Sequence, residues 1–144
     1  MKTRRKNKRP RKHGRKTRSR RQKGGDEKER INNAFIGAVT VAVVPAFDDD
    51  YENVKYLVEQ GADVNTRATF DEIAGMTALM LITEYADDID EDDEERYQYL
   101  LPTIKIMQLL IDKGADINAK DNQGWSVLQH TSSGPIQKML ILKL

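Results

Sequence analysis

Residues 61–65 of the chain read Gly-Ala-Asp-Val-Asn, and residues 114–118 read Gly-Ala-Asp-Ile-Asn. Each phrase follows an amphipathic segment of the same pattern, at residues 54–60 and 107–113. Glycine ends a helix readily because it enters the left-handed conformation without a Cβ clash. A helix, a glycine stop and a turn therefore recur at matching offsets, which predicts a chain built from stacked copies of one unit. Repeat stacks form extended binding surfaces rather than catalytic pockets.

The segments around the two phrases predict an all-α chain, in the order helix, turn, helix, glycine and extended turn. Capping side chains precede the expected helices at residues 48–50, Thr77, Thr103 and Ser126. Apolar residues recur at helical spacing and are expected to face the core. These residues are Ile31, Ala34, Phe35, Ala38 and Val39 in the first helix, Val54, Leu57 and Val58 in the second, and Ile136, Met139, Leu140 and Leu144 in the last.

The first 25 residues differ in composition from the rest of the chain. They contain fourteen Lys or Arg and no acid, whereas residues 26–144 contain ten basic and twenty-three acidic groups. Such a basic segment cannot bury enough apolar surface to offset its conformational entropy. We therefore expect a disordered basic tail at residues 1–25, with Gly24 and Gly25 as a flexible joint to a domain at residues 26–144.

The tail suits phosphate neutralisation, with affinity that falls as salt rises. It also matches a nuclear or nucleolar import signal, for which residues 8–12 form a core. No aromatic residue is interleaved, so we expect no sequence-specific base readout. A tail that only solubilises the chain is the remaining alternative. The residues assigned to targeting or nonspecific nucleic-acid contact are Arg4, Arg5, Lys6, Lys8, Arg9, Arg11, Lys12, Arg15, Lys16, Arg18, Arg20 and Arg21.

An acidic stretch lies between the two phrases, with nine carboxylates and no basic residue at residues 84–95. Asp88, Asp90 and Asp92 have the alternate spacing of a calcium loop. No glycine follows at the sharp turn, however, and Tyr99 occupies the position of the bidentate glutamate. A solvated loop is therefore favoured over a metal site, and contact with the basic tail is a second hypothesis.

Catalytic and membrane functions find little support in the sequence. The chain has no cysteine, and neither His13 nor His130 has a partner at nucleophile–base or metal-ligand spacing. The apolar run at residues 34–47 is too short and too interrupted for a membrane span or a secretory signal. We expect a non-enzymatic intracellular protein of the cytoplasm or nucleus, without a cofactor, a metal or a membrane association.

These patterns resemble the ankyrin repeat. That family's unit opens roughly as Asp-x-x-Gly-x-Thr-Pro-Leu-His and closes as Leu-Leu-x-x-Gly-Ala-Asp-Val-Asn. Residues 121–129 follow the opening and residues 74–80 follow it more loosely, while residues 57–65 and 110–118 match the close. The resemblance covers about residues 30–144 and implies a helix-turn-helix stack of about three units. It also implies a protein–protein interaction module with an unidentified protein partner.

The chain departs from this pattern in the spacing of its units. The two phrases lie 53 residues apart, whereas an ankyrin unit has about 33 residues. Four surplus residues extend the turn after the first phrase, and the others form an acidic insertion near residues 84–99. The family's proline and histidine are replaced by Ala78 and Met80, and then by Val127 and Gln129. We expect this to remove a preset first helical residue and a polar link near the helix start.

The resemblance also indicates where a partner would bind. In ankyrin proteins the residue after the turn glycine commonly lines the concave recognition face, which here assigns Met76 and Trp125 to that face. Phe70 in the extended turn, with Asn122 and Gln123 at the last turn, completes the expected protein-binding residues. The alternative for Trp125, packing on its own turn, stays open.

The last helix carries only Lys138 and Lys143 among six large apolar residues, although a terminal repeat needs a polar outer face. Docking on a partner, self-association and a remnant of a longer array are the three explanations. A different function stays open as well, that of a nucleic-acid- or virion-associated basic protein in which the repeats are only a carrier. The basic start that ends at residues 23–25 resembles tails on proteins of giant DNA viruses, which also carry divergent ankyrin repeats.

Overall fold

The computed structural model describes residues 21–42, 47–86 and 94–143. Within these residues the regular elements are helices, and the extended pairings are isolated bridges. The all-α prediction is confirmed for this part of the chain. The elements in order are α1 (Arg21–Val41), α2 (Asp48–Glu59), the 3-10 turn η1 (Asp71–Ile73), α3 (Ala78–Ala86), α4 (Glu94–Asp112), the 3-10 turn η2 (Val127–Gln129) and α5 (Gly134–Ile141).

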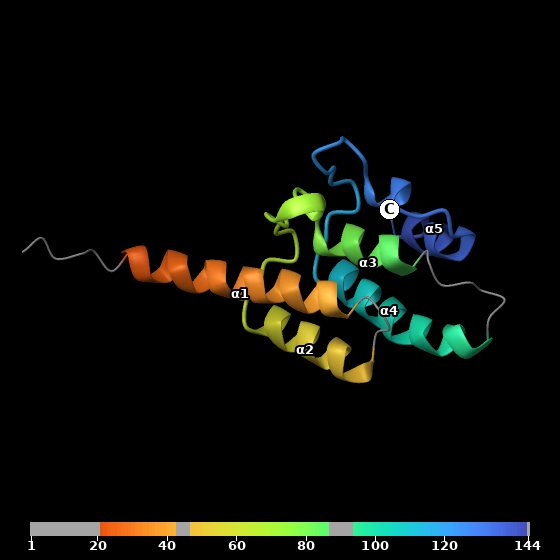
Figure 1. Cartoon of the computed structure of the whole chain (residues 1–144), viewed down its shortest axis with the longest axis horizontal. Coiled ribbons are helices and arrows are strands. Elements are labelled where there is room, and N and C mark those ends of the chain that lie inside the picture. The colour runs from red at the N-terminus through yellow and green to blue at the C-terminus, as the bar shows by residue number, and fades with distance from the viewer. Residues whose placement is uncertain (1–20, 43–46, 87–93, 144) are drawn as a thin grey trace, which may run out of the picture.

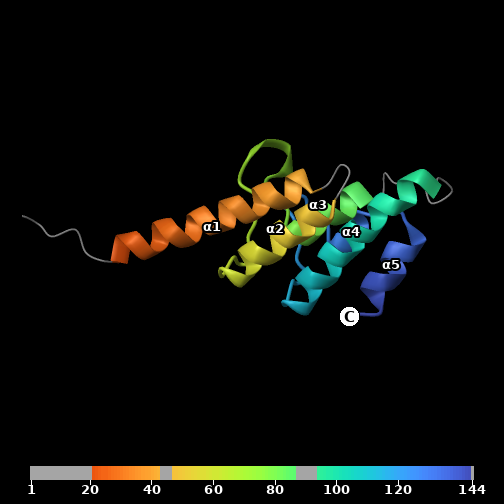
Figure 2. The same cartoon turned by 90° about the horizontal axis from the view of Figure 1, so that it is seen from below.

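The helices stack as pairs. α1 packs against α2 and α3 packs against α4, and the pairs join because α1 contacts α3 while α2 contacts α4. Figure 2 shows the helices side by side in a row that ends with α5. The connections at residues 61–77 and 114–126 both project from the same side of the helices (Figure 1). This is the helix-turn-helix stack that the repeated phrases predict.

One hydrophobic cluster runs through the stack, and α3 lies at its centre. Every residue from Ala78 to Thr83 is buried, so α3 has no exposed face until Glu84. α1 contributes Phe35, Ile36 and Val39, α2 contributes Val54, and α5 contributes Ile136 and Leu140. Ala34 is exposed, so its predicted place in the core is wrong. The buried stripe of α1 instead passes through Ile36, next to Phe35 and Val39, and Leu144 lies outside the described residues.

The starts of α2 and α3 follow local capping chemistry. The backbone N–H of Met80 donates to the Thr77 hydroxyl at 3.4 Å, which confirms Thr77 as the cap of α3. Residues 48–50 form the first turn of α2 rather than preceding it, and the Asp50 carboxylate accepts the N–H of Phe47 at 2.9 Å. The three aspartates thus stabilise the positive end of the helix dipole from inside the helix.

α4 differs most from its predicted start. It begins at Glu94 and runs through Pro102, so the prediction that Thr103 caps it is wrong. A proline inside a helix lacks one N–H and crowds the preceding turn. Here the residues around it pack into the core, because Leu100 is 7% exposed and Thr103 is 2% exposed. Of the acidic insertion, residues 84–86 belong to α3 and residues 94–99 to α4, while residues 87–93 lie outside the described residues.

α1 also extends further than expected. It begins at Arg21, so Gly24 and Gly25 lie within a helix and the predicted flexible joint is not observed. A glycine in a helix costs about 1 kcal/mol relative to alanine, which weakens a helix without forbidding it. The N-terminal turns of α1 extend beyond the end of α2 (Figure 1). Residues 1–20, the larger part of the basic tail, lie outside the described residues.

The last unit is shorter than the pattern predicts. Ser126 precedes a single 3-10 turn, η2, instead of a full helix, and the chain then continues without regular structure to α5. Hydroxyl residues compete with helical bonding by binding nearby backbone groups. Here the N–H of Ser133 donates to the Thr131 hydroxyl at 3.1 Å, and α5 begins at the next residue, Gly134.

Candidate protein-binding face

The two Gly-Ala-Asp phrases end their helices in the same way. Gly61 has φ of +95° and Gly114 has φ of +88°, the left-handed conformation expected of a helix stop. In both phrases the residue after the glycine donates its N–H back across the last turn, and the glycine N–H does the same one step inside. The paired bonds are Ala62 to Leu57 at 3.0 Å with Gly61 to Val58 at 3.1 Å, and Ala115 to Leu110 at 2.9 Å with Gly114 to Ile111 at 3.0 Å.

Asparagine side chains then join each phrase to the preceding unit. The N–H of Asp63 donates to Asn32 Oδ1 of α1 at 2.9 Å, and the N–H of Asp116 donates to Asn65 Oδ1 at 2.7 Å. The Asn65 amide also donates to the Gly114 carbonyl at 3.0 Å. The asparagine that closes the first phrase therefore holds the second phrase in place. Residues 51 and 49 positions apart in sequence become neighbours through these two contacts.

Two projecting loops follow the phrases, and we call residues 65–77 finger 1 and residues 118–126 finger 2. An antiparallel bridge closes each finger at its base, between Arg67 and Thr77 in finger 1 and between Lys120 and Ser126 in finger 2. The bridged residues are ten positions apart in finger 1 and six in finger 2. The predicted extension of the first turn by four residues is confirmed, and it contains η1.

Each finger contacts the other through a side chain that donates to the other finger's backbone. Arg67 Nη1 donates to the Gly75 carbonyl at 2.6 Å and to the Lys120 carbonyl at 2.5 Å. From the other finger, the Asn122 amide donates to the Ala74 carbonyl at 2.9 Å. Gly75 is required at this contact, because its φ is +89° and a Cβ there would lie 2.4 Å from the Asn122 side chain. The two fingers consequently form one continuous surface.

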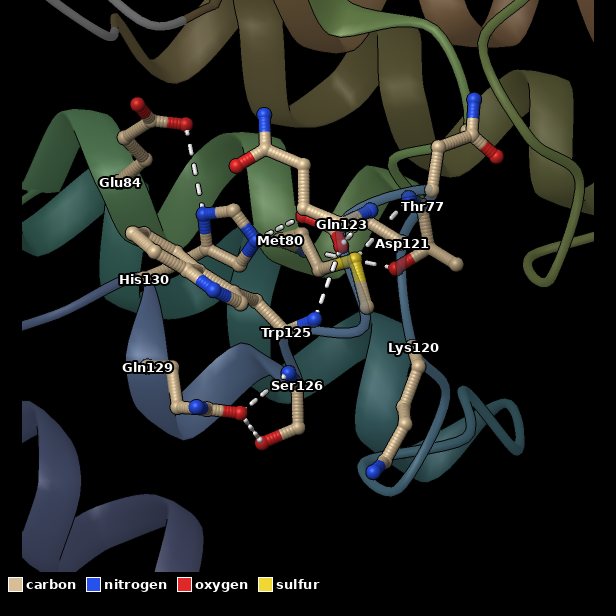
Figure 3. A network of polar contacts seen from close by, with 12 residues as sticks. Thr77, Met80, Glu84, Lys120, Asp121, Gln123, Trp125, Ser126, Gln129 and His130 are labelled. Atoms are coloured by element: carbon tan, nitrogen blue, oxygen red, sulfur yellow. Dashed lines mark hydrogen bonds and ion pairs between the residues drawn. The ribbon is translucent and has the colours of Figure 1, made fainter.

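Finger 2 is held from within by the Asp121 carboxylate (Figure 3). One oxygen accepts the N–H groups of Gln123 and Trp125, at 2.8 and 2.9 Å, and the other lies 2.9 Å from His130 Nε2. The other ring nitrogen of His130 lies 3.6 Å from the Glu84 carboxylate on α3. The side chains of Asp121 and His130 are only 5% and 8% exposed. This cluster attaches finger 2 to α3.

The surroundings of Asp121 favour its ionised form. Burial raises the pKa of its carboxyl, but the hydrogen bonds from Trp125, Gln123 and His130 outweigh that effect, so that the pKa lies below its ordinary value of 3.8. A carboxylate that accepts several hydrogen bonds is stabilised in its charged state. The sequence pattern did not reveal this cluster, because Asp121 and His130 are nine positions apart on irregular backbone. The one sequence feature that could have indicated the cluster is Asp121 itself, because it is the aspartate with which the ankyrin pattern opens.

The start of η2 retains a polar link that its substitutions were expected to remove. The N–H of Ser126 donates to the Gln129 side-chain oxygen at 2.9 Å. At the start of α3 the N–H of Thr77 lies 3.5 Å from the Met80 sulfur. Gln129 thus supplies a polar acceptor at the position of the family's histidine, whereas Met80 supplies only a weak one. The predicted loss of the link is therefore wrong for Gln129.

The structure separates the predicted binding residues into exposed and buried ones. Trp125 is 47% exposed, and its ring lies 5.9 Å from that of His130 at a tilt of 59°. Phe70 is 43% exposed, and Asn122 and Gln123 are exposed at finger 2. Met76 is 6% exposed and belongs to the core, so it cannot serve as a contact residue. The spacing analogy with Trp125 therefore does not hold for Met76, which packs in the hydrophobic cluster.

The described residues also bear on membrane insertion and on metal binding. No described helix is long and apolar enough to cross a membrane. Within residues 21–42, 47–86 and 94–143 there is also no group of three His, Cys, Asp or Glu placed to hold a metal ion. Of the basic residues assigned to targeting or nucleic-acid contact, Arg21 is the first residue of α1 and all the others lie outside the described residues.

Residues 74–122 match the model of the ankyrin repeat. The match begins in finger 1 and continues through α3, α4 and the second phrase into finger 2. No curated protein matches the chain. The chain therefore contains an ankyrin repeat at residues 74–122. Ankyrin repeats are a non-enzymatic fold that binds protein partners, and this protein is accordingly a protein–protein interaction module.

Proposed function

We propose that the protein is an adaptor that captures a protein partner on fingers 1 and 2, with Trp125 as the principal anchor. The observation that carries this proposal is the exposed but braced state of Trp125. The residue is 47% exposed, its backbone N–H donates to Asp121, and its ring lies against that of His130. Binding energy in protein interfaces concentrates on a few aromatic and arginine residues.

Bracing matters because association costs conformational entropy for each side chain that becomes ordered. Trp125 rests on the Asp121–His130 cluster, so little of its freedom remains to be lost on binding. Phe70, 43% exposed in finger 1, is the second anchor. The two aromatic residues come from separate fingers that Arg67 and Asn122 lock together. Binding of a partner that contacts both residues would therefore depend on the distance between the fingers as well as on the two side chains.

The test is capture of partners from a cell lysate with the full chain as bait. We expect Trp125→Ala to lose most of the captured protein, while the thermal midpoint stays within a few degrees of the parent. Tyr56→Ala is the matched control, because Tyr56 is an aromatic residue of α2 that is 57% exposed away from the fingers. Equal capture by both variants would reject the proposal. A large fall in stability for Trp125→Ala would instead favour its packing role.

For the basic tail we propose nuclear targeting together with nonspecific nucleic-acid contact, which places the protein in the nucleus or cytoplasm. Fourteen basic residues and no acid in residues 1–25 support this proposal. Binding of the full chain to duplex DNA should weaken steeply as salt rises. Deletion of residues 2–20 should abolish both DNA retention and nuclear accumulation.

The same deletion separates the two functional hypotheses. Under the adaptor function, the chain without residues 2–20 keeps its protein partners after nuclease treatment. Under the alternative, a nucleic-acid- or virion-associated protein whose repeats are only a carrier, it keeps none. Self-association through the end of α5, where Ile141 and the following Leu142 are 56% and 77% exposed, is a further proposal. A monomer by sedimentation at high concentration would reject it.

A further inference from the structure

A polar pocket of about 380 Å³ lies between α1 and finger 1. α1 contributes Lys28, Glu29, Asn32 and Asn33 to its lining, and finger 1 contributes Thr66, Arg67 and Thr69. All of these side chains carry polar groups, and none is a large apolar residue. The lining therefore offers hydrogen-bonding partners to a polar or charged group.

Arg67 is the best-positioned cation of this lining. Its Nη1 donates to the carbonyls of Gly75 and Lys120, which fixes the guanidinium on the backbone of both fingers. A guanidinium has five N–H donors in a planar fork. Within the described part of the chain, the Nε and Nη2 groups of Arg67 make no hydrogen bond or ion pair. Arg67 is thus held in place while donors remain for a ligand.

Lys28 supplies a second cation from α1. It is exposed, and it forms no ion pair with any residue in the described ranges. Its position depends on α1, whose residues 28–33 lie beside residues 66–69 of finger 1. Asn32 fixes that approach, because its side-chain oxygen accepts the N–H of Asp63 at 2.9 Å. The site is therefore built by an inter-unit contact and not by α1 alone.

The charge of the lining selects among anions. Lys28 and Arg67 contribute two positive charges and Glu29 contributes one negative charge, which leaves a single net positive charge. One carboxylate matches this balance, and the planar fork of arginine binds a carboxylate through two parallel hydrogen bonds. A phosphate dianion would meet repulsion from Glu29. The threonine and asparagine side chains add neutral partners for the adjoining backbone of a peptide.

We propose that this pocket binds a single carboxylate from an acidic segment of the protein partner, held by Arg67 and Lys28. The inference rests on the proposed adaptor function and adds to it the chemistry of the bound segment. It also gives the extended finger 1 a role of its own, because both Thr69 and Phe70 lie within the extension between Arg67 and Thr77. Phe70 would contact an apolar residue near the acid.

The test is a nuclear magnetic resonance titration of the full-length, ¹⁵N-labelled chain. The probe is the blocked peptide acetyl-Ala-Glu-Ala-amide, and acetyl-Ala-Gln-Ala-amide is the matched neutral peptide. We expect saturable shifts of the Asn32, Asn33, Thr66 and Thr69 amides with the glutamate peptide and none with the glutamine peptide. Mapping the shifts separates binding in the pocket from binding to the basic tail.

Three substitutions assign the effect to the lining. Lys28→Gln should weaken binding of the glutamate peptide roughly threefold, since exposed ion pairs are weak. Arg67→Lys keeps the positive charge but loses the planar guanidinium fork, and should weaken binding of the glutamate peptide about tenfold. Lys138→Gln is the control, because it makes the same charge change on α5 and should have no effect. A thermal melt checks Arg67→Lys for loss of the finger contacts, and Lys28→Gln tests the pocket without that complication.

Several outcomes would overturn the inference. Shifts confined to residues 1–20 would assign acidic peptides to the tail, and equal shifts with both peptides would exclude carboxylate recognition. Larger shifts of the four amides with inorganic phosphate would make this a phosphate site instead. Failure of the titration while Trp125→Ala still abolishes capture would reject the pocket alone. Failure of both experiments would reject the adaptor function as well.

Discussion

Finger 1 and finger 2 begin after the same phrase, yet they are stabilised in different ways. Finger 2 is short and organised from within, because the Asp121 carboxylate binds two backbone N–H groups of its own loop. Finger 1 is four residues longer; its own Arg67 side chain bonds across its base, and Asn122 of the neighbouring finger bonds to its Ala74 carbonyl. The comparison teaches that the phrase specifies how the units stack, while the loop after it is free to vary in length.

The largest effect on stability is expected from substituting the turn glycines of the two fingers. Gly75 and Gly124 have similar φ angles, +89° and +85°, but a Cβ would strike Asn122 only at Gly75. Gly75→Ala should lower the free energy of unfolding by about 2–3 kcal/mol, since it adds a lost Asn122 hydrogen bond to the left-handed strain. Gly124→Ala should cost about 1–2 kcal/mol from strain alone.

Urea denaturation of both variants measures this difference. Both glycine substitutions should also be made in the Asn122→Ala variant. Without the Asn122 side chain, Gly75→Ala should lower the free energy of unfolding no more than Gly124→Ala does. If the two glycine variants already have equal stability in the parent chain, finger 1 does not depend on finger 2 in the way described here.

A smaller effect is expected from the charge that organises finger 2. Asp121→Asn keeps an acceptor for the Gln123 and Trp125 amides but removes the charge beside His130, and should cost about 1–2 kcal/mol at neutral pH. The folded-state pKa of Asp121 lies below its ordinary value, so the unfolded chain binds more protons in acid. The stabilisation is therefore present above the unfolded pKa and lost as pH falls through the folded one.

The measurement is the free energy of unfolding from about pH 6 down to about pH 3, where this linkage operates. The parent chain should lose more stability than Asp121→Asn over this range, so the gap between them should narrow in acid. Asp116→Asn is the control, because Asp116 is an exposed aspartate whose oxygen accepts a single N–H, that of Asn118, at 2.9 Å. A gap that stays constant with pH would exclude the charge of Asp121 as the source.

The smallest expected effect concerns the residue after each finger that caps the next turn. Gln129→Ala removes the acceptor of the Ser126 N–H and should cost about 0.5–1 kcal/mol. Met80→Gln should introduce the corresponding polar acceptor for Thr77, although Met80 is fully buried and its replacement also removes apolar packing. Circular dichroism melts of Gln129→Ala give the first value. A stability unchanged by that substitution would show that η2 does not need its polar link.

Much of the stack was predictable, because its signals are local. Gly61 and Gly114 indicate helix ends because glycine adopts the left-handed conformation, and Thr77 indicates a helix start because its hydroxyl can cap the helix. The length difference between the fingers was likewise predictable, since it is a count of residues between recognisable ends. The candidate site was less accessible. Trp125 and Phe70 are exposed as expected, but Met76 is buried in the hydrophobic cluster, which its position after the turn glycine did not indicate.

Two of the errors have a physical cause in the structure. Pro102 suggested a helix boundary, since proline lowers helix propensity. That propensity of about 3 kcal/mol is smaller than the burial of a helix face, so packing overrides it at α4. In the opposite direction, Ser126 predicted a full helix and only η2 forms, because nearby hydroxyls bind the backbone locally. Nothing in the structure explains the helical conformation of Gly24 and Gly25.

Two properties of this protein follow from the order of its residues alone, its repetition and the way each repeated helix ends. Both depend on glycine and aspartate acting on backbone within a few positions. The joining of the units arises only in three dimensions. Asn65 meets Asp116, Arg67 meets the Lys120 carbonyl, and His130 stands between Asp121 and Glu84. Those contacts link residues far apart in the chain, and they exist because burial of the apolar helix faces brings the units together first.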